Sequence, residues 1–165
     1  MDTHRIEKKI LLHASIARVW SAISDAKEFG AWFGVAFDGA FTAGARLRGR
    51  IVPTTVDADI ARLQQPHAGK QFEFLVDRIE PMRSIWFHWH PFAVEPGVDY
   101  SAEPMTLIVF ELQQAAGDTL LKISESGFDQ LPEARRAQAF AANDRGWSMQ
   151  TRLIEKYLAA QPTAQ

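Results

Sequence analysis

The sequence has no cysteine among its 165 residues. Disulfide bonds, thiolate-ligated zinc, cysteine-ligated iron-sulfur clusters and a cysteine nucleophile are therefore excluded. An excess of charge of one sign is also missing, because 18 Lys and Arg stand against 20 Asp and Glu. The net charge of -2 provides no basic field for nucleic acid or for anionic lipid, so neither is an expected partner.

Long apolar runs are missing as well. No segment approaches the roughly 18 consecutive apolar residues of a membrane span, and residues 1–9 are too polar for a signal peptide. We therefore expect a cytoplasmic protein that does not enter the membrane. With 47% hydrophobic and 23% charged residues, the composition is typical of one soluble globular domain, which we expect to span residues 1–165.

The last long segment, Pro132 to Leu158, is predicted to form a single amphipathic helix. Its apolar residues recur at intervals of seven, seven and four and share one stripe: Phe140, Trp147, Ile154 and Leu158. Asn143, Asp144 and Thr151 lie on or beside this stripe, where a helix on a dry core would carry Leu or Ala. Polar groups or water are therefore expected beneath the helix.

The remaining chain predicts one strand, two short helices and then an antiparallel sheet. The first strand is expected near Arg5–His13, Ser15 caps the first short helix, and Asp25 with Glu28 resembles a capping box for the second. From Val35 onward the period is two, with strands near residues 35–41, 46–52, 71–79, 84–90, 105–112 and 119–126. A segment at 58–69 predicts one or two helical turns, and residues 91–104 a loop. The fold class is α+β, with about six or seven strands.

Several stretches resemble bacterial proteins similar to the activator of heat-shock-protein 90 ATPase homologue, within the START-like (SRPBCC) superfamily. These stretches are residues 15–25, Ala31-Trp32-Phe33-Gly34, Gly127-Phe128, and Gly146-Trp147 with the apolar residues that follow. The resemblance implies a helix-grip fold, in which a curved sheet wraps the final helix. Thr151, where the family usually has leucine, and the segment at 58–69 are departures that change the expected cavity.

The resemblance implies a function only loosely, because its members include co-chaperone domains and carriers of lipids or small ligands. Our first hypothesis is binding of a small hydrophobic or aromatic molecule between sheet and helix, by a monomer or homodimer without cofactor or metal. A second is a protein-interaction module that acts on a heat-shock ATPase. A third is an acid/base hydrolase or cyclase that uses Glu125 with His90 or Tyr100.

Aromatic residues occupy alternating strand positions and suggest an apolar cavity. The alternative is that they simply fill the core. The candidate ligand-binding residues are those expected on the inner face of the sheet and under the helix: Trp32, Phe72, Phe74, Phe87, Trp89, Phe110, Glu125, Phe140, Asn143, Trp147 and Thr151.

Glu125 is the carboxylate of most interest. Counting by two from Leu121 and Ile123 predicts that it points inward, where a raised pKa would make it an acid, a base or a ligand anchor. The alternative is a carboxylate at the strand end that pairs with Arg46 or Arg48.

His88 and His90 share a strand face, as metal ligands do, but the same count puts both outside the cavity, and no third ligand is evident. The favoured interpretation is a solvated or loop-contacting pair. His90 leads into the loop at 91–104, whose Glu95, Asp99, Tyr100 and Glu103 either fold over the cavity mouth or form an ordinary polar loop.

Overall fold

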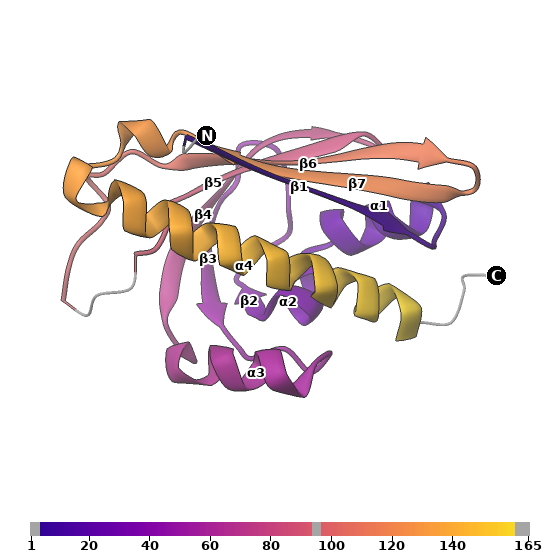
Figure 1. Cartoon of the computed structure of the whole chain (residues 1–165), viewed down its shortest axis with the longest axis horizontal. Coiled ribbons are helices and arrows are strands. Elements are labelled where there is room, and N and C mark those ends of the chain that lie inside the picture. The colour runs from indigo at the N-terminus through magenta and orange to yellow at the C-terminus, as the bar shows by residue number, and fades with distance from the viewer. Residues whose placement is uncertain (1–3, 94–96, 161–165) are drawn as a thin grey trace.

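A computed structural model describes residues 4–93 and 97–160 (Figure 1). Within these residues, seven strands form one antiparallel sheet in the order β1-β7-β6-β5-β4-β3-β2. The strands are β1 (Arg5–Leu12), β2 (Val35–Phe37), β3 (Arg46–Ile51), β4 (Gln71–Glu80), β5 (Ser84–Trp89), β6 (Thr106–Ala115) and β7 (Asp118–Ser126).

Two short helices follow the first strand, as predicted, and a long helix closes the fold. The helices are α1 (Ile16–Ser24), α2 (Ala26–Phe33), α3 (Ala58–Gln64) and α4 (Glu133–Ala160), with 3-10 turns η1 (Gln65–His67) and η2 (Phe128–Gln130). The predicted caps are present, since Ser15 accepts the Arg18 N–H and Asp25 accepts the Glu28 N–H. The helix-grip α+β fold is thereby confirmed.

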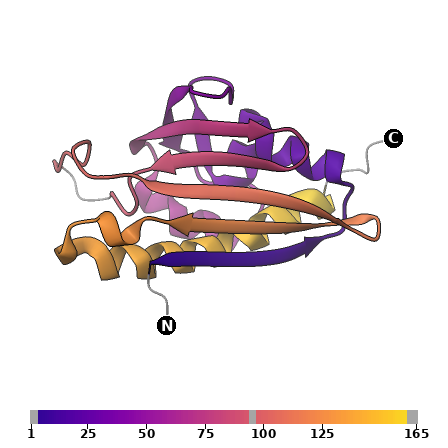
Figure 2. The same ribbon diagram turned by 90° about the horizontal axis from the view of Figure 1, so that it is seen from above.

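Helix α4 lies along one face of the sheet. In Figure 2 the strands lie in front of this helix. Its buried residues are Ala139, Trp147, Leu153 and Ile154, whereas Arg145, Arg152 and Lys156 are exposed. Strand β2 ends at Phe37, earlier than predicted, because the Asp38 carboxylate accepts the Arg48 N–H at 2.9 Å and ends the regular pairing.

The core between sheet and helices is filled by aromatic rings. Phe29 of α2 lies within 4.8–6.3 Å, centroid to centroid, of seven other rings: Trp32, Phe33, Phe37, Phe41, Phe74, Phe87 and Phe110. Trp32 is fully buried and donates its indole N–H to the Ala22 carbonyl at 2.9 Å. The space between the central strands and α2 is therefore filled by packed side chains.

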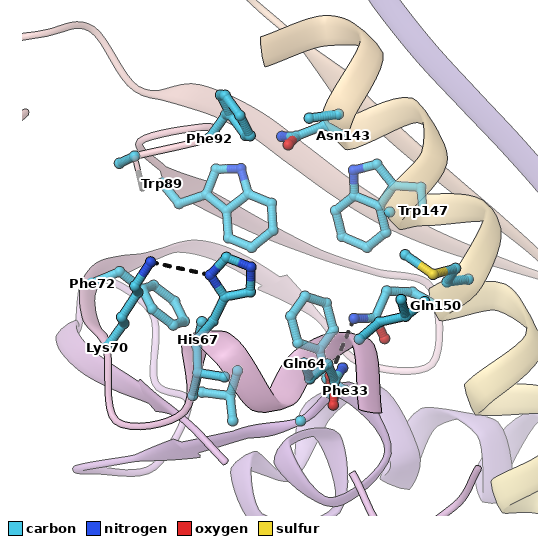
Figure 3. A pocket seen from close by; sticks show the side chains of 18 of the residues that line it. Phe33, Gln64, His67, Lys70, Phe72, Trp89, Phe92, Asn143, Trp147 and Gln150 are labelled. Carbon is cyan, nitrogen blue, oxygen red and sulfur yellow. Dashed lines mark hydrogen bonds between the residues drawn. The ribbon is translucent and has the colours of Figure 1, made fainter. Parts of the chain in front are cut away.

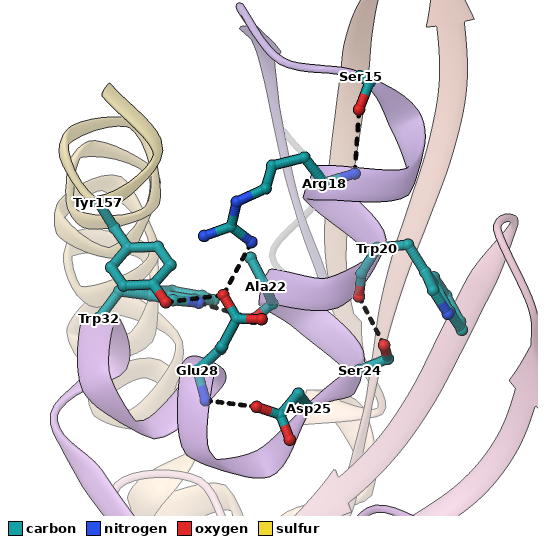
Figure 4. Close-up of polar contacts among 9 residues, drawn as sticks. All are labelled: Ser15, Arg18, Trp20, Ala22, Ser24, Asp25, Glu28, Trp32 and Tyr157. Atoms are coloured by element: carbon teal, nitrogen blue, oxygen red, sulfur yellow. Dashed lines mark hydrogen bonds and ion pairs between the residues drawn. The ribbon is translucent and has the colours of Figure 1, made fainter. Parts of the chain in front are cut away.

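A polar cluster fastens the carboxyl-terminal half of α4 to the two short helices (Figure 4). The Tyr157 hydroxyl and the Arg18 guanidinium both donate to one oxygen of Glu28, at 2.7 and 2.8 Å. Burial and the bond to Glu28 raise the pKa of Tyr157. Residues far apart in sequence thus hold α4 in place at this end.

Within the described residues, no helix combines the length and the apolar character needed to cross a bilayer.

Candidate functional site

A cavity of about 370 Å³ lies where α4, α3, the end of α2 and strands β4 and β5 meet (Figure 3). We call it the inner cavity. Five aromatic side chains dominate its lining: Phe33, Phe72, Trp89, Phe92 and Trp147. Because α3 supplies Ile60, Leu63 and Gln64, the segment that departs from the family pattern forms one wall of this cavity.

Two indole rings lie next to each other in the lining. Trp89 of β5 and Trp147 of α4 stack with their centroids 5.7 Å apart and their planes 29° apart. Phe33 meets both edge-on, at 6.0 and 5.9 Å. Such an aromatic surface suits a flat apolar molecule.

The Glu125 carboxylate lies beneath this wall and is 0% exposed. Trp89 Nε1 and Thr106 Oγ1 donate to its Oε2 at 2.7 and 2.5 Å, and Trp147 Nε1 donates to Oε1 at 2.8 Å. Asn143 Nδ2 reaches both oxygens, at 2.9 and 3.1 Å. One carboxylate therefore fixes both indoles of the wall and joins β5, β6 and β7 to α4.

The predicted inward orientation of Glu125 is confirmed. Burial raises the pKa of its carboxyl, and the four donors offset this only in part. The alternative pairing with arginine is wrong, because Arg46 bonds Glu73 at 3.0 Å and Arg48 bonds Gln71 at 3.2 Å. Asn143 also explains why a polar residue occupies the inner stripe of α4.

Two glutamine side chains that line the inner cavity bond the same backbone carbonyl. Gln64 and Gln150 both donate to the Phe33 carbonyl, at 3.0 and 3.1 Å (Figure 3). Gln150 Oε1 is buried and has no hydrogen-bond partner among the described residues.

His90 lies on the cavity, which corrects the prediction that it points away. Strand β5 ends at Trp89, so the alternation of two no longer governs the next residue. The His90 side chain is 10% exposed, its Nε2 is 3.9 Å from Glu73, and its Nδ1 has no partner among the described residues. His88 stays on the outer face, with Nε2 2.8 Å from Asp77.

The described residues contain no group of three His, Asp or Glu side chains placed to hold a metal ion.

A second cavity, of about 410 Å³, adjoins the first, and we call it the outer cavity. It is lined in part by Asp99, Tyr100 and Ser101 from the loop at 91–104. Arg135 of α4 holds this loop, since it pairs with Glu103 at 2.8 Å, bonds the Pro91 and Phe92 carbonyls and lies 4.7 Å over the Tyr100 ring. Glu95, also considered for the cavity mouth, lies outside the described residues.

The predicted ligand-binding residues divide into three groups. Four line the inner cavity: Phe72, Trp89, Asn143 and Trp147. Glu125 supports two of them from behind. The other six are not on its lining: Trp32, Phe74, Phe87 and Phe110 fill the aromatic core, Phe140 packs on Phe128 at 5.3 Å, and the Thr151 hydroxyl donates to the Ser148 carbonyl at 2.8 Å.

Sequence reasoning missed several lining residues, among them Phe33, Gln64, Phe92, Gly146 and Gln150. Phe33 and Gly146 stand within the stretches that carry the family resemblance, next to Trp32 and Trp147. Gln150 is a polar residue directly before Thr151, and it could also have been recognised from the sequence as a candidate lining residue.

The comparisons with known proteins agree with this architecture. A family model described as Activator of Hsp90 ATPase homolog 1-like protein matches residues 13–159. No curated protein matches the chain.

Solved structures with the same architecture share little sequence with the chain. A solution structure of a protein from Arthrobacter aurescens has 17% identity and a TM-score of 0.73, with 100% of this chain and 92% of that chain covered. The Aha1 dimer from Colwellia psychrerythraea has 16% identity and a TM-score of 0.67, covering 94% and 96%. DynU16, described as a putative protein in the dynemicin biosynthetic locus, has 21% identity and a TM-score of 0.67. The alignment covers 95% of this chain and 48% of DynU16, so the chain spans about half of that protein's length.

Proposed function

The chain belongs to the Activator of Hsp90 ATPase homolog 1-like family, and from this premise we propose that it binds a small, flat, hydrophobic or aromatic molecule in the inner cavity. Binding is non-covalent. The observation that carries the proposal is the stacked wall of Trp89 and Trp147, whose two N–H groups are both turned away from the cavity toward Glu125. Because the polar N–H edges are bonded to Glu125, the rings offer a ligand apolar surface.

The size of the inner cavity supports a small ligand. Its volume of about 370 Å³ is near the lower end of the range of roughly 300–1,000 Å³ found for ligand pockets. A molecule of a few rings fits this space.

Preorganisation supports binding as well. The Glu125 hydrogen bonds hold both indoles in place without a ligand, so little side-chain freedom is lost on binding. Interaction with a heat-shock ATPase, which the family name suggests, and the acid/base hypothesis both stay predictions.

Gly146 allows a direct test of the proposal. It lies in α4 on the cavity lining, and a Cβ at this position meets nothing within 4 Å. Gly146→Phe is therefore expected to place a ring in the cavity without straining the helix. Gly146→Ala is the matched control, because it adds a side chain that leaves most of the space empty.

The probe is para-methylbiphenyl, and the readout is quenching of the intrinsic tryptophan fluorescence by titration. The unmodified protein and Gly146→Ala are expected to bind it, and Gly146→Phe to lose at least tenfold in affinity. Failure of the unmodified protein to bind the probe, or unchanged binding by a folded Gly146→Phe variant, would contradict the proposal.

A further inference from the structure

Two basic side chains on the lining of the inner cavity take no part in the Glu125 hydrogen bonds. His67, the last residue of η1, and Lys70, directly before β4, both line this cavity. Lys70 Nζ lies 3.1 Å from His67 Nδ1. Figure 3 shows the His67 ring beneath the two indoles, with Lys70 on the side away from Trp147. The two side chains thus place a polar group beside the aromatic wall.

The contact with Lys70 determines which nitrogen of the His67 ring carries the proton. A lysine ammonium can only donate a hydrogen bond, so Nδ1 accepts and the ring proton lies on Nε2. The positive charge next to Nδ1 draws electron density from the ring, which makes the Nε2–H group a stronger donor. His67 therefore offers a polarised N–H on the side of the ring remote from Lys70.

The Nε2–H group of His67 is accessible to a ligand. It has no hydrogen-bond partner among residues 4–93 and 97–160, and it does not belong to the buried unpartnered atoms, as His90 Nδ1 and Gln150 Oε1 do. The side-chain amides of Gln64 and Asn143, by contrast, already donate to oxygens of the protein. A ligand in the inner cavity can therefore use the His67 donor without breaking a bond of the protein.

The charges around the cavity favour an anionic acceptor. Among the described residues that line the inner cavity, none is Asp or Glu, whereas Lys70 brings a positive charge. Glu125 is fully buried and its oxygens accept from four side chains, so it presents no negative oxygen on the lining. Hydrogen bonds to a charged acceptor are stronger than those to a neutral one. A carboxylate therefore gains more at His67 than a neutral carbonyl or hydroxyl group does.

We propose that the ligand is an aromatic carboxylic acid bound as its carboxylate, and that His67 and Lys70 select it. The ring system lies against Trp89 and Trp147, one carboxylate oxygen accepts from His67 Nε2–H, and the Lys70 charge balances that of the ligand. This assignment rests on the proposed function, because it specifies the ligand class for the same cavity.

Two probes of the same shape test the selection: para-phenylbenzoate and para-phenylbenzamide. The amide keeps one carbonyl oxygen as an acceptor and removes the charge. Binding is measured at neutral pH by the same quenching of tryptophan fluorescence. The unmodified protein is expected to prefer the benzoate about tenfold, or about 1.4 kcal/mol, which is the typical difference between a hydrogen bond to a charged and to a neutral group.

Three variants assign this preference to residues. His67→Phe keeps a ring but removes the Nε2–H group, and Lys70→Met keeps the length of the side chain but removes its charge. Each is expected to reduce the preference to about twofold or less. Lys122→Met is the matched control, because Lys122 pairs with Glu111 and does not line the inner cavity. This control is expected to keep the full preference.

The outcomes separate the two proposals. A preference that His67→Phe retains in full, or that Lys122→Met loses as Lys70→Met does, would overturn the assignment to His67 and Lys70. Equal binding of both probes by the unmodified protein, or binding of para-methylbiphenyl alone, would overturn the carboxylate selectivity and leave the proposed function standing. Binding of none of the three compounds would overturn the proposed function itself.

A measurement on the unmodified protein does not depend on the folding of a variant. Long-range proton–nitrogen NMR spectra of the histidine rings are expected to show the His67 proton on Nε2, and a larger shift of this nitrogen with para-phenylbenzoate than with para-phenylbenzamide. A His67 proton on Nδ1, or an identical response to both probes, would refute the assignment.

Discussion

Replacement of Glu125 by glutamine is expected to destabilise the protein even though the two side chains have almost the same shape. Four side chains donate to the two carboxylate oxygens. A glutamine has one oxygen and one NH₂ group, and the NH₂ group cannot accept. In either orientation of the amide, it faces an indole N–H that also cannot accept.

The size of the effect follows from which donors can adapt. The Thr106 hydroxyl can rotate and the Asn143 amide can turn over, so both can present an acceptor to the new NH₂ group. Trp89 and Trp147 cannot, and one of these two buried N–H groups is left unpaired. An unsatisfied buried donor costs about 1–3 kcal/mol, which we expect as the loss in the free energy of unfolding of Glu125→Gln at neutral pH.

Urea denaturation of Glu125→Gln measures this loss, and Glu111→Gln is the matched control. Glu111 lies on the neighbouring strand β6 with a side chain that is 46% exposed, and it pairs with Lys122 at 3.3 Å. Its replacement is expected to cost less than about 0.5 kcal/mol. Equal stability losses in the two variants would refute the role assigned to the Glu125 hydrogen bonds.

The pH dependence of the same variant tests the effect of burial on the charge. Burial raises the folded-state pKa of Glu125 above its ordinary value of 4.5. A raised pKa means that the carboxyl's contribution to stability is fully present below pH 4.5 and is lost as the pH rises through the folded-state pKa. The stability advantage of the unmodified protein over Glu125→Gln should therefore shrink as the pH rises, and an advantage that grows with pH would show that the four hydrogen bonds outweigh burial.

Two further predictions concern the contacts that hold α4. Tyr157→Phe removes one of the two donors to Glu28, and Arg18 still donates to that carboxylate. Urea denaturation should show a loss of about 0.5–1.5 kcal/mol in the free energy of unfolding. No loss would contradict the role of this cluster in holding α4. Lys156 and the cap of α3 lower the pKa of Asp57 from 3.8 to about 2, which means that its contribution is present above pH 3.8 and is lost as the pH falls toward about 2. Asp57→Asn should therefore flatten the acid-unfolding curve in this window, and an unchanged curve would show that the pair adds nothing to stability.

The order of elements and the inner face of the sheet were predictable from sequence because both depend on local periodicity. Strand β7 keeps a strict alternation through Leu121 and Ile123 to Glu125, so the inward direction of the carboxylate followed from counting. The polar Asn143 on the apolar stripe of α4 indicated a polar partner, and that partner is Glu125.

The extent of the cavity was not predictable in the same way. Alternation shows that Phe74, Phe87 and Phe110 point inward, but not whether another ring fills the space above them. Phe29, from a helix distant in sequence, fills it. Only the assembled fold distinguishes an inward aromatic residue in the core from one on a cavity.

Irregularities in the strands limited the prediction of the remaining site residues. His90 falls just past the end of β5, where a count by two has no meaning. In β4, the register shifts between Val76 and Arg78, so Asp77 has no regular partner and the alternation is displaced by one residue. The periodicity of the sequence carries no information on the cytoplasmic location or the oligomeric state, and both stay predictions.

Glu125 makes the stability of the grip and the shape of the proposed site depend on the same hydrogen bonds. Trp89 belongs to the sheet and Trp147 to α4, and the carboxylate binds both. If α4 moved away from β5 to admit a ligand, it would break the hydrogen bonds that Trp147 and Asn143 donate to Glu125, which is costly. We therefore expect a ligand to enter from the side of the outer cavity, past His90, while α4 stays in place.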